Sequence, residues 1–187
     1  MPSFKKAGPE VAALAALLLE QYETHASIRD NHVKIDFMFA NAFVDEKTGE
    51  PIEDAIKHHG VKALGVTTKI SLKDRAKGMG DAEVLLDGDW WEQATPEEQA
   101  ALLDHELHHI VGTSKRDAIG RPIVALRQHD HQFGWFEVIA KRHGQASQEV
   151  QQAARMMDQS GQSYWPSIAG ALATVSRTAR LELQTTK

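Results

Sequence analysis

The chain has 187 residues, of which 42% are hydrophobic and 25% charged, with a formal net charge of −5 and no cysteine. This composition predicts a soluble globular protein with one main domain, and it excludes a disulfide framework and any thiolate metal site. The negative charge argues against a broad, nonspecific nucleic-acid surface. No apolar run is long enough to span a membrane, so we expect a cytoplasmic protein without a membrane partner and leave its oligomeric state open.

The first part of the chain predicts a helix followed by strands. Gly8, Pro9 and Glu10 are typical of a helix start, and the helix should run to about His25. Residues 32–39 alternate polar and apolar side chains, which predicts a half-buried strand, and residues 64–72 and 83–87 are further strand candidates. We therefore expect a small mixed or antiparallel sheet.

Histidines in this first part have unremarkable settings. His58 and His59 precede Gly60, which suggests a solvated helix end. His25 flanks a loop, and we expect no chemical role for it.

A second helix is predicted from Thr95. Thr95 has the side chain of an N-cap, Pro96 suits the first helical position, and Glu98 completes a capping box. The helix should run to about Val111, with Gly112 as its stop. Its apolar stripe should face the core and consists of Leu103, Leu107 and Ile110.

Residues 105–109 of this helix spell H-E-x-x-H. On a helix, residues i and i+4 lie one above the other, so His105 and His109 can hold one metal ion. Glu106 points toward a neighbouring face, where its carboxylate can accept a proton from a metal-bound water. The pattern is typical of zinc-dependent peptidases.

A catalytic zinc ion takes a third protein ligand, and the candidates lie downstream in a predicted helix over residues 128–143. His129 should be on the side of that helix that faces the core and the first metal ligands. We favour His129, with Glu137 as the fallback and His131 as the remaining alternative.

Other polar side chains could support such a site. Asp104 and Asp130 are candidates for carboxylates that orient a ligand imidazole. Four further side chains are candidates for stabilising an oxyanion, and the sequence does not choose among them: Arg127, His131, His143 and Tyr164.

The segment from Leu102 to Ile110, followed by His129-Asp130, by Phe133 and by a helix that ends at Gly144, resembles the putative phage metallopeptidase family. Members of that family are compact H-E-x-x-H proteins encoded in phages and prophages. The resemblance extends over about residues 31–144, and a more distant likeness is to the SprT-like zinc peptidases. The chain departs from the pattern in having His108 within the motif and His131 after the His-Asp pair.

The resemblance implies an α+β, zincin-like domain over residues 1–144, in which an N-terminal helix, a small sheet, the H-E-x-x-H helix and a following ligand-bearing helix succeed one another. It implies a zinc ion held by His105, His109 and His129, with Glu106 as the general base. The implied activity is hydrolysis of a protein or peptide substrate in the cytoplasm of the host cell.

A non-catalytic, metal-stabilised protein that binds or regulates a host factor is the alternative. The intact Glu106 favours the enzyme, because a purely structural metal site needs no base beside it. A fourth ligand from His131 or Asp130 would favour the alternative.

Residues 145–187 are expected to form a helical C-terminal extension. Residues 147–159 predict a polar helix, and residues 168–183 predict a weaker amphipathic one. This tail could dock on the domain, cover its cleft or bind a partner.

Overall fold

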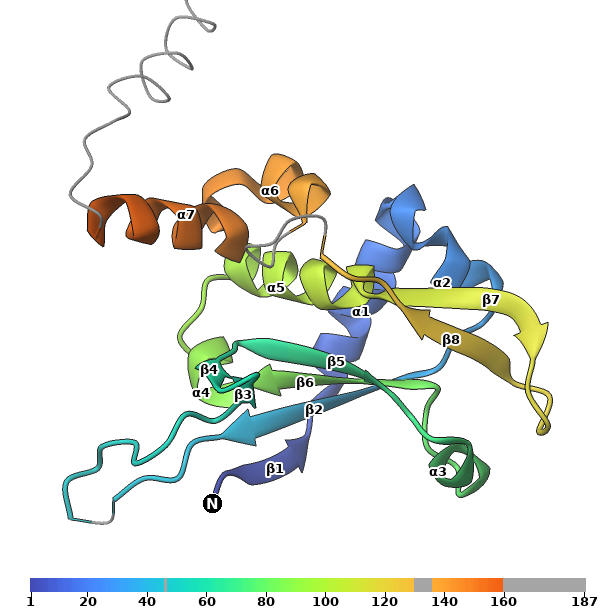
Figure 1. Ribbon diagram of the computed structural model, residues 1–187, viewed down its shortest axis with the longest axis horizontal. Coiled ribbons are helices and arrows are strands. Elements are labelled where there is room, and N and C mark those ends of the chain that lie inside the picture. The colour runs from blue at the N-terminus through green and yellow to red at the C-terminus, as the bar shows by residue number, and fades with distance from the viewer. Residues whose placement is uncertain (46, 130–135, 160–187) are drawn as a thin grey trace, which may run out of the picture. The chain divides into compact units, whose positions relative to one another are not determined.

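A computed structural model describes residues 1–45, 47–129 and 136–159 of the chain. Residues 1–149 form one compact unit, and residues 150–187 form a second. The first unit combines helices with small sheets, which confirms the predicted α+β class (Figure 1). Of the helices described, none is both long enough and apolar enough to cross a membrane. The domain boundary expected after Gly144 stays a prediction.

The largest sheet has four strands in the order β1-β2-β6-β5. Its strands are β1 (Ser3–Lys6), β2 (Ile35–Asn41), β5 (Gly65–Lys69) and β6 (Ala82–Asp87). β2 and β6 pair in parallel, whereas β1 and β5 pair antiparallel with their neighbours. The sheet is therefore mixed, and β5 is one of its two edges.

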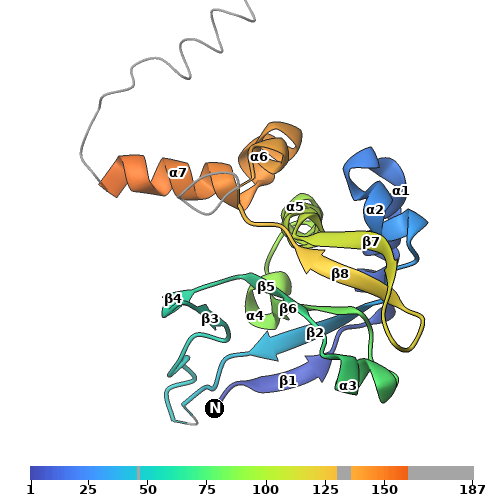
Figure 2. The same ribbon diagram turned by 45° about the vertical axis from the view of Figure 1, so that its right-hand side comes forward.

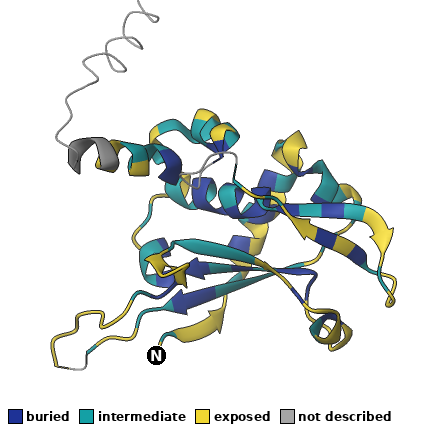
Figure 3. Cartoon of the chain, in the orientation of Figure 1, coloured by how far each residue is buried: buried dark blue, intermediate teal, exposed yellow. Residues whose placement is uncertain are grey.

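Two helices pack on this sheet and enclose the core (Figure 2). They are α1 (Pro9–Gln21) and α5 (Pro96–His108). Leu103 and Leu107 of the predicted apolar stripe are fully buried, as are Val84 and Leu86 of β6. Buried residues are frequent in β6 and in α5 and occur at the end of β2 (Figure 3).

The start of α5 is the capping box that the sequence predicted. The Thr95 hydroxyl accepts a hydrogen bond from the Glu98 amide, and the Glu98 carboxylate accepts one from the Thr95 amide at 3.0 Å. The predicted end of the helix at Val111 is wrong. α5 ends at His108, His109 is its C-cap, and a strand begins at Ile110.

That strand forms a hairpin that the sequence did not predict. It consists of β7 (Ile110–Arg116) and β8 (Pro122–Leu126), which pair antiparallel. Gly112 lies within β7 and is not a helix stop. A Cβ at Gly112 would lie 2.3 Å from the carbonyl oxygen of Ser27, so only glycine allows this close approach.

Two further predictions about local structure are wrong. His58 and His59 lie in a short hairpin, β3 (Lys57–His58) and β4 (Val61–Lys62), not at a helix end. His59 and Gly60 both have positive φ, which is the backbone of a type I′ hairpin turn. The helix expected over residues 128–143 does not include residues 128 and 129; residues 130–135 lie outside the described residues, and α6 covers Glu137–His143.

The remaining helices are short, apart from α7. They are η1 (Glu23–His25), α2 (Ala26–Asp30), α3 (Leu72–Ala76), α4 (Gly88–Trp91), α6 (Glu137–His143), η2 (Gly144–Ala146) and α7 (Gln148–Gln159). α7 matches the polar helix predicted over residues 147–159. The second helix predicted in the tail, over residues 168–183, lies outside the described residues.

Candidate metal centre

Three histidine side chains meet at the C-terminal end of α5. His105 and His109 come from this helix and its C-cap, and His129 comes from the segment that follows β8. One ring nitrogen of each lies within 4.8 Å of those of the other two. The Nε2 atoms of His105 and His129 are 3.2 Å apart. The structure therefore brings together the three histidines that the sequence singled out as ligands.

Hydrogen bonds on the far side of the rings fix which nitrogen faces the centre. His109 donates from Nδ1 to the backbone carbonyl of Arg127 at 2.8 Å. His105 donates from Nδ1 to the Glu149 carboxylate at 2.5 Å. Because a carbonyl and a carboxylate accept hydrogen bonds from the Nδ1 atoms, the Nε2 lone pairs are left for a cation.

This donor set fits a zinc ion. Nitrogen ligands at the usual zinc distance and in tetrahedral geometry lie about 3.3 Å from one another, close to the spacing of the His105 and His129 Nε2 atoms. Burial lowers the pKa of His109 to about 4. Burial and the two neighbouring histidines also lower the pKa of His129 to about 4. Both rings are therefore neutral at pH 7, which is the form that binds a metal.

His105 has a different electrostatic setting. Burial would lower its pKa, but the hydrogen bond to Glu149 and the charge of Glu106 outweigh burial and raise this pKa. Burial acts to raise the pKa of Glu149, but the hydrogen bond and the charge of His105 outweigh burial and lower this pKa. The two groups thus form a buried pair whose negative partner stays ionised.

Phe136 lies against the histidine cluster. Its ring centroid is 5.0 Å from that of His105, 4.8 Å from that of His109 and 4.9 Å from that of His129. Its side chain is fully buried. Phe136 therefore restricts how the three rings can turn and excludes water from one side of the cluster.

Glu106 lies beside the cluster and against the edge strand β5. Its side chain is only 3% exposed, and its Oε2 accepts a hydrogen bond from the Thr67 hydroxyl at 2.7 Å. A Cβ on Gly65 would lie 2.5 Å from Glu106 Oε1, so the glycine leaves room for the carboxylate. Burial raises the pKa of Glu106 above its ordinary value, although His105 and Thr67 oppose this shift. A raised pKa suits a carboxylate that takes up a proton near neutral pH.

Asp104 does not orient a ligand imidazole, contrary to the prediction. Its carboxylate is fully buried and accepts hydrogen bonds from His25 at 2.6 Å and from His143 at 2.7 Å. Arg142 donates to the same carboxylate. Burial alone would raise the pKa of Asp104, but these three partners hold it well below its usual range. His25, for which we expected no role, is thus part of a buried charged cluster that joins α5 to α6 and η1.

The other proposed site residues lie elsewhere or outside the described residues. Glu137, the fallback ligand, is exposed and forms an ion pair with Lys141. Two candidates for the oxyanion are engaged with other partners, because Arg127 donates to His108 Nε2 and His143 is bound to Asp104. Outside the described residues lie Asp130, His131 and Tyr164.

Sequence reasoning missed the residues that support the cluster from other elements. Glu149 lies in a polar run where nothing distinguishes it from its neighbours, and Thr67 lies within a strand candidate. The one available signal was chemical: a ligand histidine needs an acceptor for its second nitrogen.

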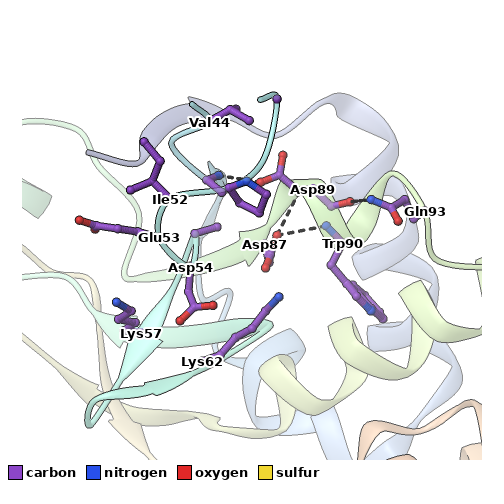
Figure 4. A pocket seen from close by; sticks show the side chains of 14 residues that line it. Val44, Ile52, Glu53, Asp54, Lys57, Lys62, Asp87, Asp89, Trp90 and Gln93 are labelled. Atoms are coloured by element: carbon purple, nitrogen blue, oxygen red, sulfur yellow. Dashed lines mark hydrogen bonds between the residues drawn. The ribbon is translucent and has the colours of Figure 1, made fainter. Parts of the chain in front are cut away.

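A separate cavity of about 570 Å³ lies between α4 and residues 42–57 (Figure 4). Trp90 lines it, together with Lys57 and Lys62 of the short hairpin. Asp87 and Asp89 also line it, but their carboxylates accept hydrogen bonds from backbone amides nearby. None of the three clustered histidines lines this cavity, and neither does Glu106.

Comparison with known proteins identifies a family for this chain. No curated protein and no solved structure matches the chain. The family model described as "Putative phage metallopeptidase" matches residues 4–159, which include nearly all of the four-stranded sheet, the H-E-x-x-H helix, His129 and Glu149. This match confirms the resemblance inferred from the motif and extends it at both ends. The chain therefore belongs to the putative phage metallopeptidase family.

Proposed function

We propose that the protein is a zinc-dependent peptidase that hydrolyses peptide bonds, with Glu106 as its general base. The observation that carries this proposal is the convergence of three histidine nitrogens beside a buried carboxylate. The family description supports a phage or prophage origin and a protein or peptide substrate. We place the activity in the cytoplasm of the host cell.

The residues present suit zinc by their chemistry. His105, His109 and His129 would hold the ion, and three neutral nitrogen ligands are the set found in several catalytic zinc sites. When bound, zinc lowers the pKa of a coordinated water and polarises a carbonyl group. A base that stays buried beside these ligands would have no purpose in a purely structural site, so Glu106 favours the enzyme over the metal-stabilised binding protein.

Glu106 would take up the proton of the attacking water and deliver it to the amide nitrogen that leaves. The Thr67 hydroxyl holds one carboxylate oxygen, and Gly65 leaves room for the other. Phe136 would exclude water from one side of the histidines and so strengthen electrostatic interactions there.

The edge strand β5 offers a place for an extended substrate. It is an outer strand of the four-stranded sheet, and its residues Gly65 and Thr67 lie against Glu106. A peptide that added to this edge as a further strand would pass the carboxylate with its backbone held by hydrogen bonds.

Replacing Thr67 by valine is expected to slow hydrolysis without loss of zinc. The substitution keeps the shape of the side chain but removes the donor to Glu106, a change of about 1–2 kcal/mol that corresponds to roughly 5- to 30-fold in rate. Steady-state rates beside metal analysis measure this. Thr68→Val is the matched control, because Thr68 is exposed on the same strand. Equal rates for the Thr67 and Thr68 variants would show that the hydrogen bond from Thr67 to Glu106 does not assist hydrolysis.

The direct test of the function is hydrolysis of a denatured protein, such as unfolded casein, followed by mass spectrometry of the fragments. We expect cleavage that a chelator abolishes and that added zinc restores. A preparation that holds zinc yet cleaves neither denatured protein nor a diverse peptide library would favour the metal-stabilised binding protein.

A further inference from the structure

The second nitrogen of His105 is bound by a residue far along the chain. Glu149 belongs to the first turn of α7, which begins at Gln148. Its Oε1 accepts the Nδ1 proton of His105 at 2.5 Å. Glu149 lies 44 residues after His105, beyond Gly144, where we expected the catalytic domain to end.

Burial of the Glu149 side chain limits the groups that can contact its carboxylate. The Glu149 side chain is only 2% exposed, so water cannot replace the histidine as its partner. Its second oxygen, Oε2, is buried and has no hydrogen-bond partner among the residues that the structure describes. A carboxylate in this setting is costly unless a positive charge lies close to it. A cation on the opposite nitrogen of His105 would supply that charge through the ring.

Glu149 also contacts Phe136, which packs on the histidine cluster. The amide of Phe136 points at Glu149 Oε1 from 3.5 Å, and Phe136 packs on the rings of His105 and His129. One carboxylate therefore contacts a ligand on α5 and the residue that packs beneath two ligands.

The ring nitrogen that Glu149 contacts indicates that Glu149 supports the ligand His105 and is not itself a fourth ligand. Its oxygen binds Nδ1 of His105, whereas the nitrogen that faces His129 is Nε2. Carboxylates in this position fix the tautomer and the orientation of a ligand imidazole and increase its basicity.

We propose that Glu149 is the positioning residue for the metal ligand His105, so that the start of α7 is part of the metal centre and not of a separable extension. The proposal rests on the proposed zinc site. It assigns to α7 the supporting carboxylate that we had expected from Asp104.

The test is zinc affinity, measured by competition with a chromogenic chelator on full-length protein. Glu149→Gln keeps the size of the side chain, and Glu149→Ala removes it. We expect the zinc dissociation constant to rise roughly 10- to 100-fold in both variants. The visible spectrum of the cobalt-loaded protein should also change in both, because the angle of one imidazole ligand changes.

Two controls separate positioning from general stability. Glu97→Gln makes the same chemical change at an exposed site on α5 and should leave zinc affinity unchanged. Ile139→Val removes one methyl group from a fully buried residue of α6 and should lower the urea midpoint of unfolding without a change in zinc affinity.

The outcomes distinguish this proposal from the proposed function. If wild-type protein binds no zinc, the zinc site itself fails. If wild type binds zinc and both Glu149 variants bind it as tightly, the site stands and the part assigned to Glu149 is wrong. If neither variant folds, Glu149 is required for the fold and not for the orientation of one imidazole, which also overturns the proposal.

Discussion

Glu106→Gln is expected to bind zinc like wild type and to lose hydrolysis by roughly 10²- to 10⁴-fold. Glutamine fills the same buried space and can still accept the Thr67 hydrogen bond, but it cannot take up a proton. The three histidine nitrogens are unchanged by the substitution, so the metal ligands remain in place. Initial rates on denatured casein, measured beside zinc content, give both quantities from one preparation.

Glu97→Gln is the matched control, because it makes the same change at an exposed position of the same helix. It should cleave at the wild-type rate. An active Glu106→Gln variant would remove Glu106 from the mechanism, even if the zinc site proved correct.

Asp104→Asn is expected to lower the free energy of unfolding by about 3–5 kcal/mol. The fully buried carboxylate accepts hydrogen bonds from His25, Arg142 and His143. An amide of the same size removes the negative charge and leaves the Arg142 guanidinium, with only 15% of its side chain exposed, without its counter-charge. Urea denaturation of metal-free protein, followed by circular dichroism, measures the loss.

Asp30→Asn serves as the control for this substitution. Asp30 pairs with Arg29 at the surface, with 63% of its side chain exposed, and such exposed pairs contribute little to stability. If the Asp104 and Asp30 variants lost the same small stability, the charged cluster between α5 and α6 would not hold these elements together.

The parts of the fold that the sequence predicted correctly depend on local signals. Thr95 and Glu98 are three residues apart and form the capping box without help from the rest of the chain. The strand candidates became β2, β5 and β6, and the expected alternation of more and less buried side chains is clearest in β6.

The end of α5 could not be predicted in the same way. Ile110 continues the apolar stripe of the helix, so its periodicity favoured one more turn. In the structure Ile110 is buried in β7, where its strand pairs with β8 and Gly112 packs on Ser27. This pairing is a tertiary contact, and it outweighs the helical pattern.

The same difference between local signals and tertiary contacts applies to the candidate site. The spacing of His105 and His109 places both on one helix face whatever the rest of the fold does. His129 lies with them, but β8 brings it there and not the predicted helix. The residue was inferred correctly as a neighbour of the pair, and the element that carries it was wrong.

Adjacency in sequence does not predict which carboxylate contacts a ligand histidine. Asp104 precedes His105, but consecutive helical residues point about 100° apart, so Asp104 faces α6 and its cluster. Glu149 is distant in sequence, but its carboxylate accepts a hydrogen bond from His105. Only the packing of α6 and the start of α7 decides which carboxylate reaches the ligand.

Metal content by mass spectrometry tests the central claim most directly. Wild-type protein purified with zinc supplied should contain one zinc ion per chain, and His105→Ala and His129→Ala should contain none. His32→Asn is the control, because His32 is exposed and has a positive φ that asparagine tolerates. A wild-type protein that binds no zinc would contradict the metal centre, and zinc retained without His129 would assign the third ligand to another residue.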